Sequence, residues 1–526
     1  MFPLLSTIVF LPLLGGIIVL LLPGRVTRAI RGVALSVALL DLLFVFALFL
    51  VYAQVNLAAS SSIIGASFSS TFLTQETEKF TLVASGNFTL GYSLGVDGIS
   101  MLLVALTSLL TVVCIAASFR VEQRLKNYMA FMLLLESGIL GVFLATNLFL
   151  FYIFWELMLI PAYLLVGSWG GERRIYAAFK FVLYTSVGSL LMLAAIIALG
   201  YYHQLASGTY SLDLFDVLNT KLDPATQTWL FLAMALAFAI KVPFVPFHSW
   251  LPDVYSEAPA PVTAMLAGAM SKTGAYGFLR FCLPLFPNAF QQFSTLLSVL
   301  AVIGILYCAL LALTQTDMKR LLGYSSISHL GVVMLGMFAL NVQGVEGSVL
   351  QMVNHGITTA ALFLIVGLIE SRAGTRDLRE FGGMALRVPL LAVVLLIAVL
   401  SSLGLPGLNS FTGEFLALLG IFQQSVVLGV LATAVVVPAA WYLIRLFLSV
   451  MTGPRLAEGH VAILLRKGQF KDLQLGEFVT IAPLLALIFL IGFQPNPLTA
   501  VMEPSVVNTL QTLQHTLHNV GSAFIR

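Results

Sequence analysis

The sequence is poor in charge and in cysteine, and each shortage excludes classes of protein. Asp, Glu, Lys and Arg make up only 9% of the 526 residues, whereas soluble globular domains contain about 25%. The three cysteines all lie in apolar runs and none has CxxC spacing, which argues against a metal centre, an iron–sulfur cluster or a disulfide framework. We expect the following cysteines to pack within helices: Cys114, Cys282 and Cys308.

Patterns of catalysis and of cofactor binding are also missing. The sequence contains no recognisable arrangement of nucleophile, base and oxyanion donors, and no glycine-rich loop or other cofactor fingerprint. We therefore expect no cofactor, no metal and no covalent chemistry in this chain.

Hydrophobic residues take the place of charge, at 59% of the chain and with a mean hydropathy of +1.01. A helix that spans a bilayer needs about 20 apolar residues, and runs near that length recur along the sequence. We predict an all-α, polytopic membrane protein with about fourteen transmembrane helices. Their expected ranges are 3–23, 32–53, 97–118, 127–146, 148–169, 176–202, 227–247, 260–281, 292–314, 320–340, 348–370, 388–412, 425–451 and 478–499.

The loops provide an independent test of this count, because cytoplasmic loops collect Lys and Arg. Loops after odd-numbered helices hold eighteen of these residues, whereas loops after even-numbered helices, with the C-terminal tail, hold three. Both termini should therefore face away from the cytoplasm. The first charge is Arg25, and no basic region precedes the first apolar run. We read that run as a retained transmembrane helix rather than a signal peptide.

Two of the expected helices are interrupted. The seventh breaks at KVPFVP, where prolines remove backbone donors, and the twelfth breaks at GLPGLNSFTGE, five helices later. An odd displacement inverts orientation in the membrane, so we expect two inverted five-helix repeats, in which Lys241 and Glu414 are counterparts. Paired broken helices point to an ion path. The expected parts are 1–96 (first helices and outer loop), 97–126 (third helix and linker), 127–281 and 292–451 (the repeats), and 452–526 (last helix and amphipathic tail).

Five charged residues lie inside apolar sequence. Lys241 and Lys272 interrupt two apolar stretches, and a lysine near the middle of a bilayer costs about 2.5–3.5 kcal/mol on insertion scales. Glu156 lies in FYIFWELMLIP, and Glu414 directly follows the second break. Glu136, in FMLLLESGILGVF, could extend the carboxylate group of Glu156, or pair with Lys126 or a neighbouring helix. Each charge either has a local partner at a helix end or takes part in moving charge.

Three histidines are further candidates. His329 and His355 fall on consecutive apolar helices, and an imidazole can both donate and accept a proton near neutral pH. Both are therefore candidates for a proton path, with hydrogen-bonded packing as the alternative. His248 follows the first break and either delivers protons or braces the break. We assign structural roles to four other residues, Asp41, Lys180, Glu370 and Arg445.

Several motifs carry a resemblance to a known family. The segments FWELMLIPAYLLVGSWGG, AFAIKVPFVPFHSWLPD, MLAGAMSKTGAYGFLRF, QTDMKRLLGYSSISHLG and NSFTGEF resemble the antiporter-like subunits of respiratory complex I and its relatives, over roughly residues 95–450. The chain is most similar to the NuoM/NdhD (chain 4) type, because it stops soon after the fourteenth helix. SWGGERRIYAAFKFVLYT resembles the cyanobacterial and chloroplast form, in which ferredoxin supplies electrons and plastoquinone receives them, although Phe179 and Val254 depart from it.

The resemblance implies roles for particular residues. Glu156 and Lys241 would form a paired site, Lys272 would be the central relay and Glu414 the exit-side group. An opposite charge near a lysine favours its ammonium form, so a pair that opens and closes would act as a proton gate. His329 and His355 would lie on a water-lined axis, with no cofactor or metal involved.

The resemblance also implies a function. The chain would be a proton-translocating subunit of a type I NAD(P)H dehydrogenase-like complex, which couples reduction of plastoquinone or another quinone elsewhere in the complex to proton pumping. Its partners would be lipids and other membrane subunits, including antiporter-like subunits of the chain 5 and chain 2 types. A thylakoid membrane and the carbon dioxide uptake paralogue fit the cyanobacterial form. The alternatives are an Mrp-type cation/proton antiporter subunit and a non-pumping membrane scaffold.

Overall fold

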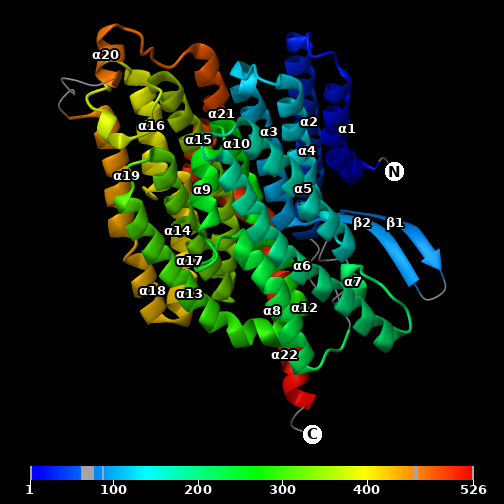
Figure 1. The fold of residues 1–526 in the computed structure, drawn as a ribbon. Helices are drawn as coiled ribbons and strands as arrows, with labels where there is room; N and C mark the ends of the chain where they lie inside the picture. Colours follow the sequence, from blue (N-terminus) through cyan, green and yellow to red (C-terminus); the bar gives the residue numbers. More distant parts are fainter. Residues whose placement is uncertain (1–2, 61–75, 86–87, 219, 454–459, 524–526) are drawn as a thin grey trace.

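The protein is nearly all helical (Figure 1). The computed structural model describes residues 3–60, 76–85, 88–218, 220–453 and 460–523. Within these residues, eleven helical spans are long and apolar enough to cross a membrane. They are α1 (Leu4–Leu21), α2 (Thr27–Ser60), α3 (Gly98–Ala117), α4 (Leu125–Leu144), α5 (Leu148–Trp169), α6 (Arg174–Ser207), α13 (Pro287–Thr314), α14 (Met318–Phe338), α15 (Val342–Ala373), α18 (Val426–Thr433) with α19 (Val436–Met451), and α21 (Leu475–Phe493).

Three further segments are built from shorter pieces. The first pairs α8 (Pro224–Lys241) with α9 (Trp250–Glu257), and the third pairs α16 (Pro389–Ser402) with α17 (Asn409–Gln424). The middle segment contains two stretches of π-helix: α10 (Ala260–Met265), η3 (Leu266–Met270), α11 (Lys272–Gly277), η4 (Phe278–Cys282) and α12 (Leu283–Leu285). Together with the eleven uninterrupted spans, these segments match the fourteen predicted from the sequence.

Both predicted interruptions are present, and their causes are local. Helix α8 ends at Lys241, just before Pro243 and Pro246, which have no backbone N–H to donate. Between α16 and α17, Gly404 and Gly407 have φ angles of +75° and +91°, a region that glycine enters without steric cost. The two breaks therefore follow from residues that the sequence displays.

The two predicted counterparts lie on different sides of their breaks. Lys241 is the last residue of α8, before the first break, whereas Glu414 lies within α17, after the second. The two residues therefore do not occupy matching positions relative to their breaks. Helix α5 packs on α4 and α6, and α14 packs on α13 and α15. The superposition of the two repeats after inversion, and the five-part division of the chain, remain predictions.

The outer loop after α2 contains structure that the all-α prediction missed. Strands β1 (Glu76–Ser85) and β2 (Phe88–Val96) form an antiparallel hairpin. Glu78 of this hairpin accepts hydrogen bonds from the backbone N–H groups of Leu5 and Ser6 at the start of α1. Its sequence is rich in Thr, Phe, Tyr and Val, which favour strands. We interpreted the serine- and threonine-rich loop only as a cap.

The C-terminal tail forms a helix, as its amphipathic pattern predicts. Helix α22 (Asn496–Ala523) follows α21 and buries Val506, Leu510 and Leu513, whereas the side chain of Leu517 lies outside the described residues. The helix packs against α3 and α15, and Ser505 Oγ accepts a hydrogen bond from the N–H of Gly98 over 3.0 Å. The short helices α7 (Leu214–Val217) and α20 (His460–Arg466) lie in loops. The three cysteines are buried and free, as expected.

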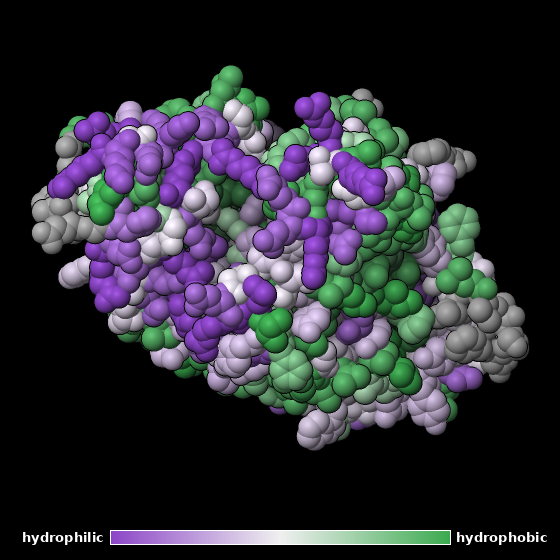
Figure 2. Space-filling model, turned by 45° about the horizontal axis from the view of Figure 1, so that its top comes forward, coloured by the Kyte–Doolittle hydropathy of each residue, from purple (hydrophilic) through white to green (hydrophobic). Residues whose placement is uncertain are grey.

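Hydrophilic residues gather at one end of the molecule. Figure 2 looks onto the end that carries α20 and shows polar residues across it and apolar residues on the flanks. Ion pairs join the loops there: Arg120 lies 2.6 Å and Arg372 2.5 Å from carboxylate oxygens of Glu477. The N-terminal end of α1 and the C-terminal end of α22 point away from this end (Figure 1).

This arrangement predicts which introduced cysteines a reagent can reach from the cytoplasm. Arg174, the first residue of α6, and Lys467 are exposed at the basic end, and Lys221 is exposed in an outer loop. A membrane-impermeant maleimide applied to the cytoplasmic face should label Arg174→Cys and Lys467→Cys but not Lys221→Cys. The three native cysteines are buried and serve as the unlabelled background. The reverse pattern of labelling would overturn the orientation.

Candidate functional site

Four of the predicted residues form a continuous series in the core. Lys272 Nζ lies 2.8 Å from His355 Nδ1, and the rings of His355 and His329 have centroids 5.9 Å apart. His329 Nδ1 in turn lies 2.7 Å from Glu414 Oε1. Helices α11, α15, α14 and α17 each supply one of these groups. The structure thus connects residues that are more than 140 positions apart in the sequence.

The π-helix η3 prepares the position of Lys272. The N–H of Ser271 donates to the carbonyl of Leu266, five residues back, and therefore does not donate to Ala267. The Ala267 carbonyl instead accepts hydrogen bonds from Lys272 Nζ and Ser271 Oγ. A π-bulge often marks a functional site because it frees a carbonyl in this way. The buried ammonium group is consequently satisfied by its own helix and by His355.

Lys241 lies in a different environment. It is 1% exposed, and its Nζ has no hydrogen-bond partner. The ammonium group instead lies 5.3 Å from the ring centroids of both Trp155 and Phe181, where it gains cation–π attraction. The charge of Glu156 also acts on it. Helix α5 supplies both Trp155 and Glu156 as consecutive residues.

Glu156 and Lys241 are near each other but do not form an ion pair in the described part of the chain. Glu156 is partly exposed, between the exposed side chains of Ile153 and Ile160 on the outward face of α5. One of its carboxylate oxygens, Oε1, is buried without a hydrogen-bond partner. A modest movement of the Lys241 side chain would therefore replace its contact with the aromatic rings by an ion pair with Glu156.

The two lysine segments pack tightly against each other through Gly274. A Cβ at this position would lie 2.8 Å from the carbonyl oxygen of Phe238 and 3.1 Å from Lys241 Cβ. Glycine therefore allows α11 to approach the end of α8 closely. This contact places Lys241 and Lys272 on adjacent surfaces, although no hydrogen bond joins their side chains.

The structure does not bring Glu136 to Glu156. Glu136, on α4, is fully buried, and the charge that acts on it belongs to Asp41 of α2. Of the possibilities that the sequence left open, contact with a neighbouring helix is the one the structure shows, and extension of the Glu156 group is not. Asp41, which we assigned a structural role, is its actual neighbour.

His248 lies in the segment between α8 and α9, outside the series. Its ring packs edge-on against Tyr307 with centroids 5.6 Å apart, and its Nδ1 is buried without a hydrogen-bond partner. The next residue is tied to α6, because Lys180 Nζ donates to the carbonyl of Ser249 over 2.9 Å. Lys180 also forms an ion pair with Asp253 over 2.8 Å, so it is held by a partner rather than free to reach the surface.

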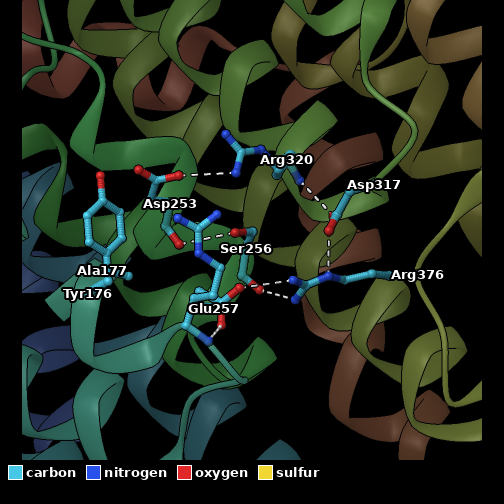
Figure 3. A pocket seen from close by; sticks show the side chains of 9 residues that line it. Tyr176, Ala177, Asp253, Ser256, Glu257, Asp317, Arg320 and Arg376 are labelled. Carbon is cyan, nitrogen blue, oxygen red and sulfur yellow. Dashed lines mark hydrogen bonds and ion pairs between the residues drawn. The ribbon is translucent and has the colours of Figure 1, made fainter.

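A polar cavity of about 170 Å³ lies at the basic end beside α9 (Figure 3). Asp253 binds Arg320 over 3.1 Å, and Glu257 and Asp317 both bind Arg376, over 3.1 and 2.5 Å. Its lining residues are Arg173, Tyr176, Ala177, Asp253, Ser256, Glu257, Asp317, Arg320 and Arg376. Sequence reasoning missed these acids, although Asp253 and Asp317 lie within the motifs HSWLPD and QTDMKR.

The charges around this cavity perturb one another. Burial raises the pKa of Asp317, although the Arg376 guanidinium opposes this shift. Burial disfavours the charge of Arg376, but Asp317 and Glu370 hold its pKa above the ordinary value. Glu370 also binds Lys319 over 2.6 Å, in keeping with the structural role expected for it. The cavity therefore combines alternating charges at the basic end.

A buried amide network, also missed from the sequence, fixes the second break beside His355. Asn354 Nδ2 donates to the carbonyl of Asn409 over 2.7 Å, and Asn409 Nδ2 donates to the carbonyl of Asn354 over 3.2 Å. Ser401 Oγ donates to Asn409 Oδ1 over 2.6 Å. Gln351 Nε2 donates to Glu414 Oε1 over 2.9 Å. These bonds hold α16 and α17 against α15, so His355 and Glu414 keep their relative positions.

The groups brought together here are proton donors and acceptors. Within the described residues, no three His, Cys, Asp or Glu side chains gather in a way that would hold a metal ion. Lysine, imidazole and carboxylate groups in hydrogen-bond contact can pass protons along a buried line. The arrangement supports charge movement through the protein.

Comparisons with known proteins agree with this chemistry. Residues 145–438 match the family described as NADH:quinone oxidoreductase/Mrp antiporter, TM. The chain is 39% identical to NADH-quinone oxidoreductase subunit M of Rickettsia prowazekii, over 97% of this chain and 99% of that protein. It is 38% identical to NADH-ubiquinone oxidoreductase chain 4 of Chondrus crispus, over 96% of this chain and 97% of that protein.

Solved structures show the same fold. A chain of respiratory complex I from Thermus thermophilus has a TM-score of 0.83 at 33% identity, with 97% of this chain and 99% of that chain covered. A chain of the Mrp complex from Dietzia sp. has a TM-score of 0.79 at 20% identity, which shows the fold alone. None of these names mentions plastoquinone, so the predicted closeness to the cyanobacterial and chloroplast form is not supported.

The contact at Gly274 leads to a prediction about stability. Gly274→Ala would place a Cβ 2.7 Å from Val242 Cγ2, and overpacking of this kind costs about 1–3 kcal/mol. We expect a lower thermal midpoint for the detergent-solubilised protein and less of it in membranes. Gly167→Ala is the control, because its Cβ would meet Ala178 Cβ at an ordinary 3.5 Å. Equal midpoints for the two variants would disprove the close packing of the lysine segments.

Proposed function

Because the chain belongs to the NADH:quinone oxidoreductase/Mrp antiporter transmembrane family, we propose that it translocates protons as the chain 4-type membrane subunit of a complex I-like NADH-quinone oxidoreductase. Its own residues carry the protons, while other subunits transfer electrons and reduce the quinone. The observation that carries this proposal is the series Lys272, His355, His329 and Glu414, in which two neighbouring imidazole rings join two hydrogen-bonded pairs. Non-pumping scaffolds have no use for four ionisable groups in contact, each costly to bury.

The relatives favour NADH as electron donor. They are named for reduction of quinone or ubiquinone by NADH, whereas the predicted plastoquinone-linked form would take electrons from ferredoxin. A thylakoid location and a carbon dioxide uptake role depend on that form and have no support. We therefore propose a bacterial or mitochondrial-type NADH-quinone oxidoreductase, in which both termini lie on the non-cytoplasmic or equivalent side of the membrane.

The geometry suggests how a proton moves along the series. A proton enters from the basic end, where the polar cavity lies beside α9. Lys241 takes the proton while Glu156 stabilises its ammonium form, and releases it when the carboxylate withdraws, because burial without a counter-charge favours the neutral amine. Lys272, across the Gly274 contact, then receives it.

The histidines carry the proton onward. His355 Nδ1 faces Lys272 and His329 Nδ1 faces Glu414, so each ring has its Nε2 left for transfer between the two rings. The ring spacing of 5.9 Å lets a proton cross by way of one water molecule. Glu414 in α17, held by Gln351 and next to the second break, releases it on the outer side.

We propose other membrane subunits as partners, in addition to lipids. The outward face of α6 exposes a row of apolar side chains, including Leu183, Val187 and Leu190, and Glu156 opens onto the adjacent face of α5. A carboxylate among apolar residues suits a neighbouring protein that supplies polar groups more than it suits lipid alone. Antiporter-like subunits of the chain 5 and chain 2 types are the candidates from the resemblance.

Substitutions of the paired site test the gate. Glu156→Gln removes the charge that stabilises the ammonium form of Lys241, and a nearby opposite charge changes a proton-binding equilibrium by about tenfold or more. We expect NADH-driven proton translocation in membrane vesicles to fall by about that factor, with partial activity in Glu156→Asp. Lys241→Ala should be at least as damaging. The double variant should be little worse than either single, because the two residues act as one unit.

Assembly must be measured in the same membranes by blue-native gel, since loss of the complex would imitate loss of the pump. If assembled Glu156→Gln complexes translocate protons at the wild-type rate, the gate assigned to this pair does not exist.

Affinity purification separates the complex I-like assignment from the Mrp-type alternative. We expect a tagged chain, extracted in mild detergent, to bring with it quinone-reducing subunits and NADH:quinone activity. A preparation that lacks this activity but exchanges sodium for protons in liposomes would favour the Mrp-type antiporter.

A further inference from the structure

Two carboxyl groups lie together in the core, away from the series described above. Asp41 of α2 and Glu136 of α4 are both 0% exposed. Ser108 Oγ of α3 donates to Asp41 Oδ2 over 2.8 Å. Asp41 Oδ1 and both oxygens of Glu136 are buried without a hydrogen-bond partner. Fully buried carboxyl oxygens without a partner are rare and require a physical explanation.

The surroundings provide no cation for this pair. Helix α1 has no titratable residue, and α3 contributes the hydroxyls of Ser108 and Thr111 near the pair and Cys114 one turn further on. On α5, Tyr152 and Glu156 interact with Ser189 and Lys241 instead.

On α11, Lys272 is bound to Ala267 and His355. The charge that acts on Glu136 is that of Asp41. No ion pair reaches either residue from the described part of the chain.

Two ionised carboxylates without a cation are strongly disfavoured in such a place, because burial and mutual repulsion both oppose the second charge. A single proton removes one charge and supplies a donor for the neighbouring oxygen. We propose that Asp41 and Glu136 form a buried proton-binding site, in which the two carboxyl groups share one proton at neutral pH and exchange it with solution. This site is additional to the Lys241–Glu414 path.

The site adjoins the segment that carries Lys272. Thr111 Oγ1 contacts Met265 Sδ over 3.7 Å, and Met265 directly precedes η3. Leu110, beside Thr111, packs on Gly268 inside η3. A change in protonation at Asp41 and Glu136 thus occurs one side-chain layer from the π-helix that positions Lys272. Proton binding at this site can be measured at equilibrium, without proton pumping. A negative result here would therefore leave the proposed function untouched, and the reverse also holds.

Infrared spectroscopy can detect the shared proton directly. The purified complex, reconstituted in liposomes, is titrated over the pH range in which it stays intact, and difference spectra are recorded in the region of protonated carboxylic C=O stretches. We expect the wild type to show a C=O band that changes with pH and shifts in D₂O. Glu136→Gln should remove it, and Asp41→Asn should remove or displace it. Ser137→Ala is the matched control, because its hydroxyl donates to the Val9 carbonyl of α1 instead, and should keep the band.

The same spectra identify the results that would overturn the proposal. A wild-type spectrum that both carboxyl variants leave unchanged would show that the pair does not titrate. A band present at every pH would show a permanent structural hydrogen bond. Loss of the band on addition of sodium at constant pH would assign the site to a metal cation. Because the variants preserve side-chain size, their thermal midpoints and assembly in the same preparations should match those of the wild type. If either variant is less stable or assembles poorly, a Ser108→Ala variant replaces it. That variant removes the donor to Asp41 and must displace the band.

Discussion

The cost of burying an ionisable group is the constraint on which the rest of this structure depends. A charge removed from water must gain partners or lose its proton. Lys272 meets this requirement with a freed carbonyl and His355, and Glu414 meets it with His329 and Gln351. Lys241 meets it only with aromatic faces. From Lys272 to Glu414, each group therefore lies next to another that can take its proton, and these contacts make a path.

Irregular helices provide these partners. In a regular α-helix the backbone carbonyls accept hydrogen bonds from N–H groups of the same helix. A regular helix would therefore leave Lys272 without a carbonyl acceptor. The π-helix at Leu266–Met270 frees one, and the break at Gly404 opens the space that Asn409 and Asn354 fill with reciprocal hydrogen bonds. The same departures from regular helical structure therefore serve both stability and function. The hydrogen bonds that hold the breaks closed also keep the proton carriers in line.

The sequence predicted the segments and the residue types, but only part of their grouping. Fourteen apolar segments, both breaks and the buried lysines follow from composition and proline chemistry, because these are local properties. The partners of each charge depend on how helices rotate against one another, which no single stretch encodes. The sequence therefore left the partner of Glu136 open and did not single out Asp41, and Asp253 was overlooked although it lies in the motif HSWLPD. The hairpin of β1 and β2 was missed because its contacts with α1 join segments that are far apart in the sequence.

The central claim is that protons cross the core through the contact between Lys272 and the histidines. His355→Leu breaks that contact while keeping a side chain of similar bulk. His203→Leu is the control, because His203 is also buried but binds Thr220 at the outer end of α6. In vesicles with equal amounts of assembled complex, NADH-driven acidification should be about tenfold slower in His355→Leu, as expected for loss of a positioned proton carrier, and unchanged in His203→Leu. Acidification at the wild-type rate in His355→Leu would contradict the path.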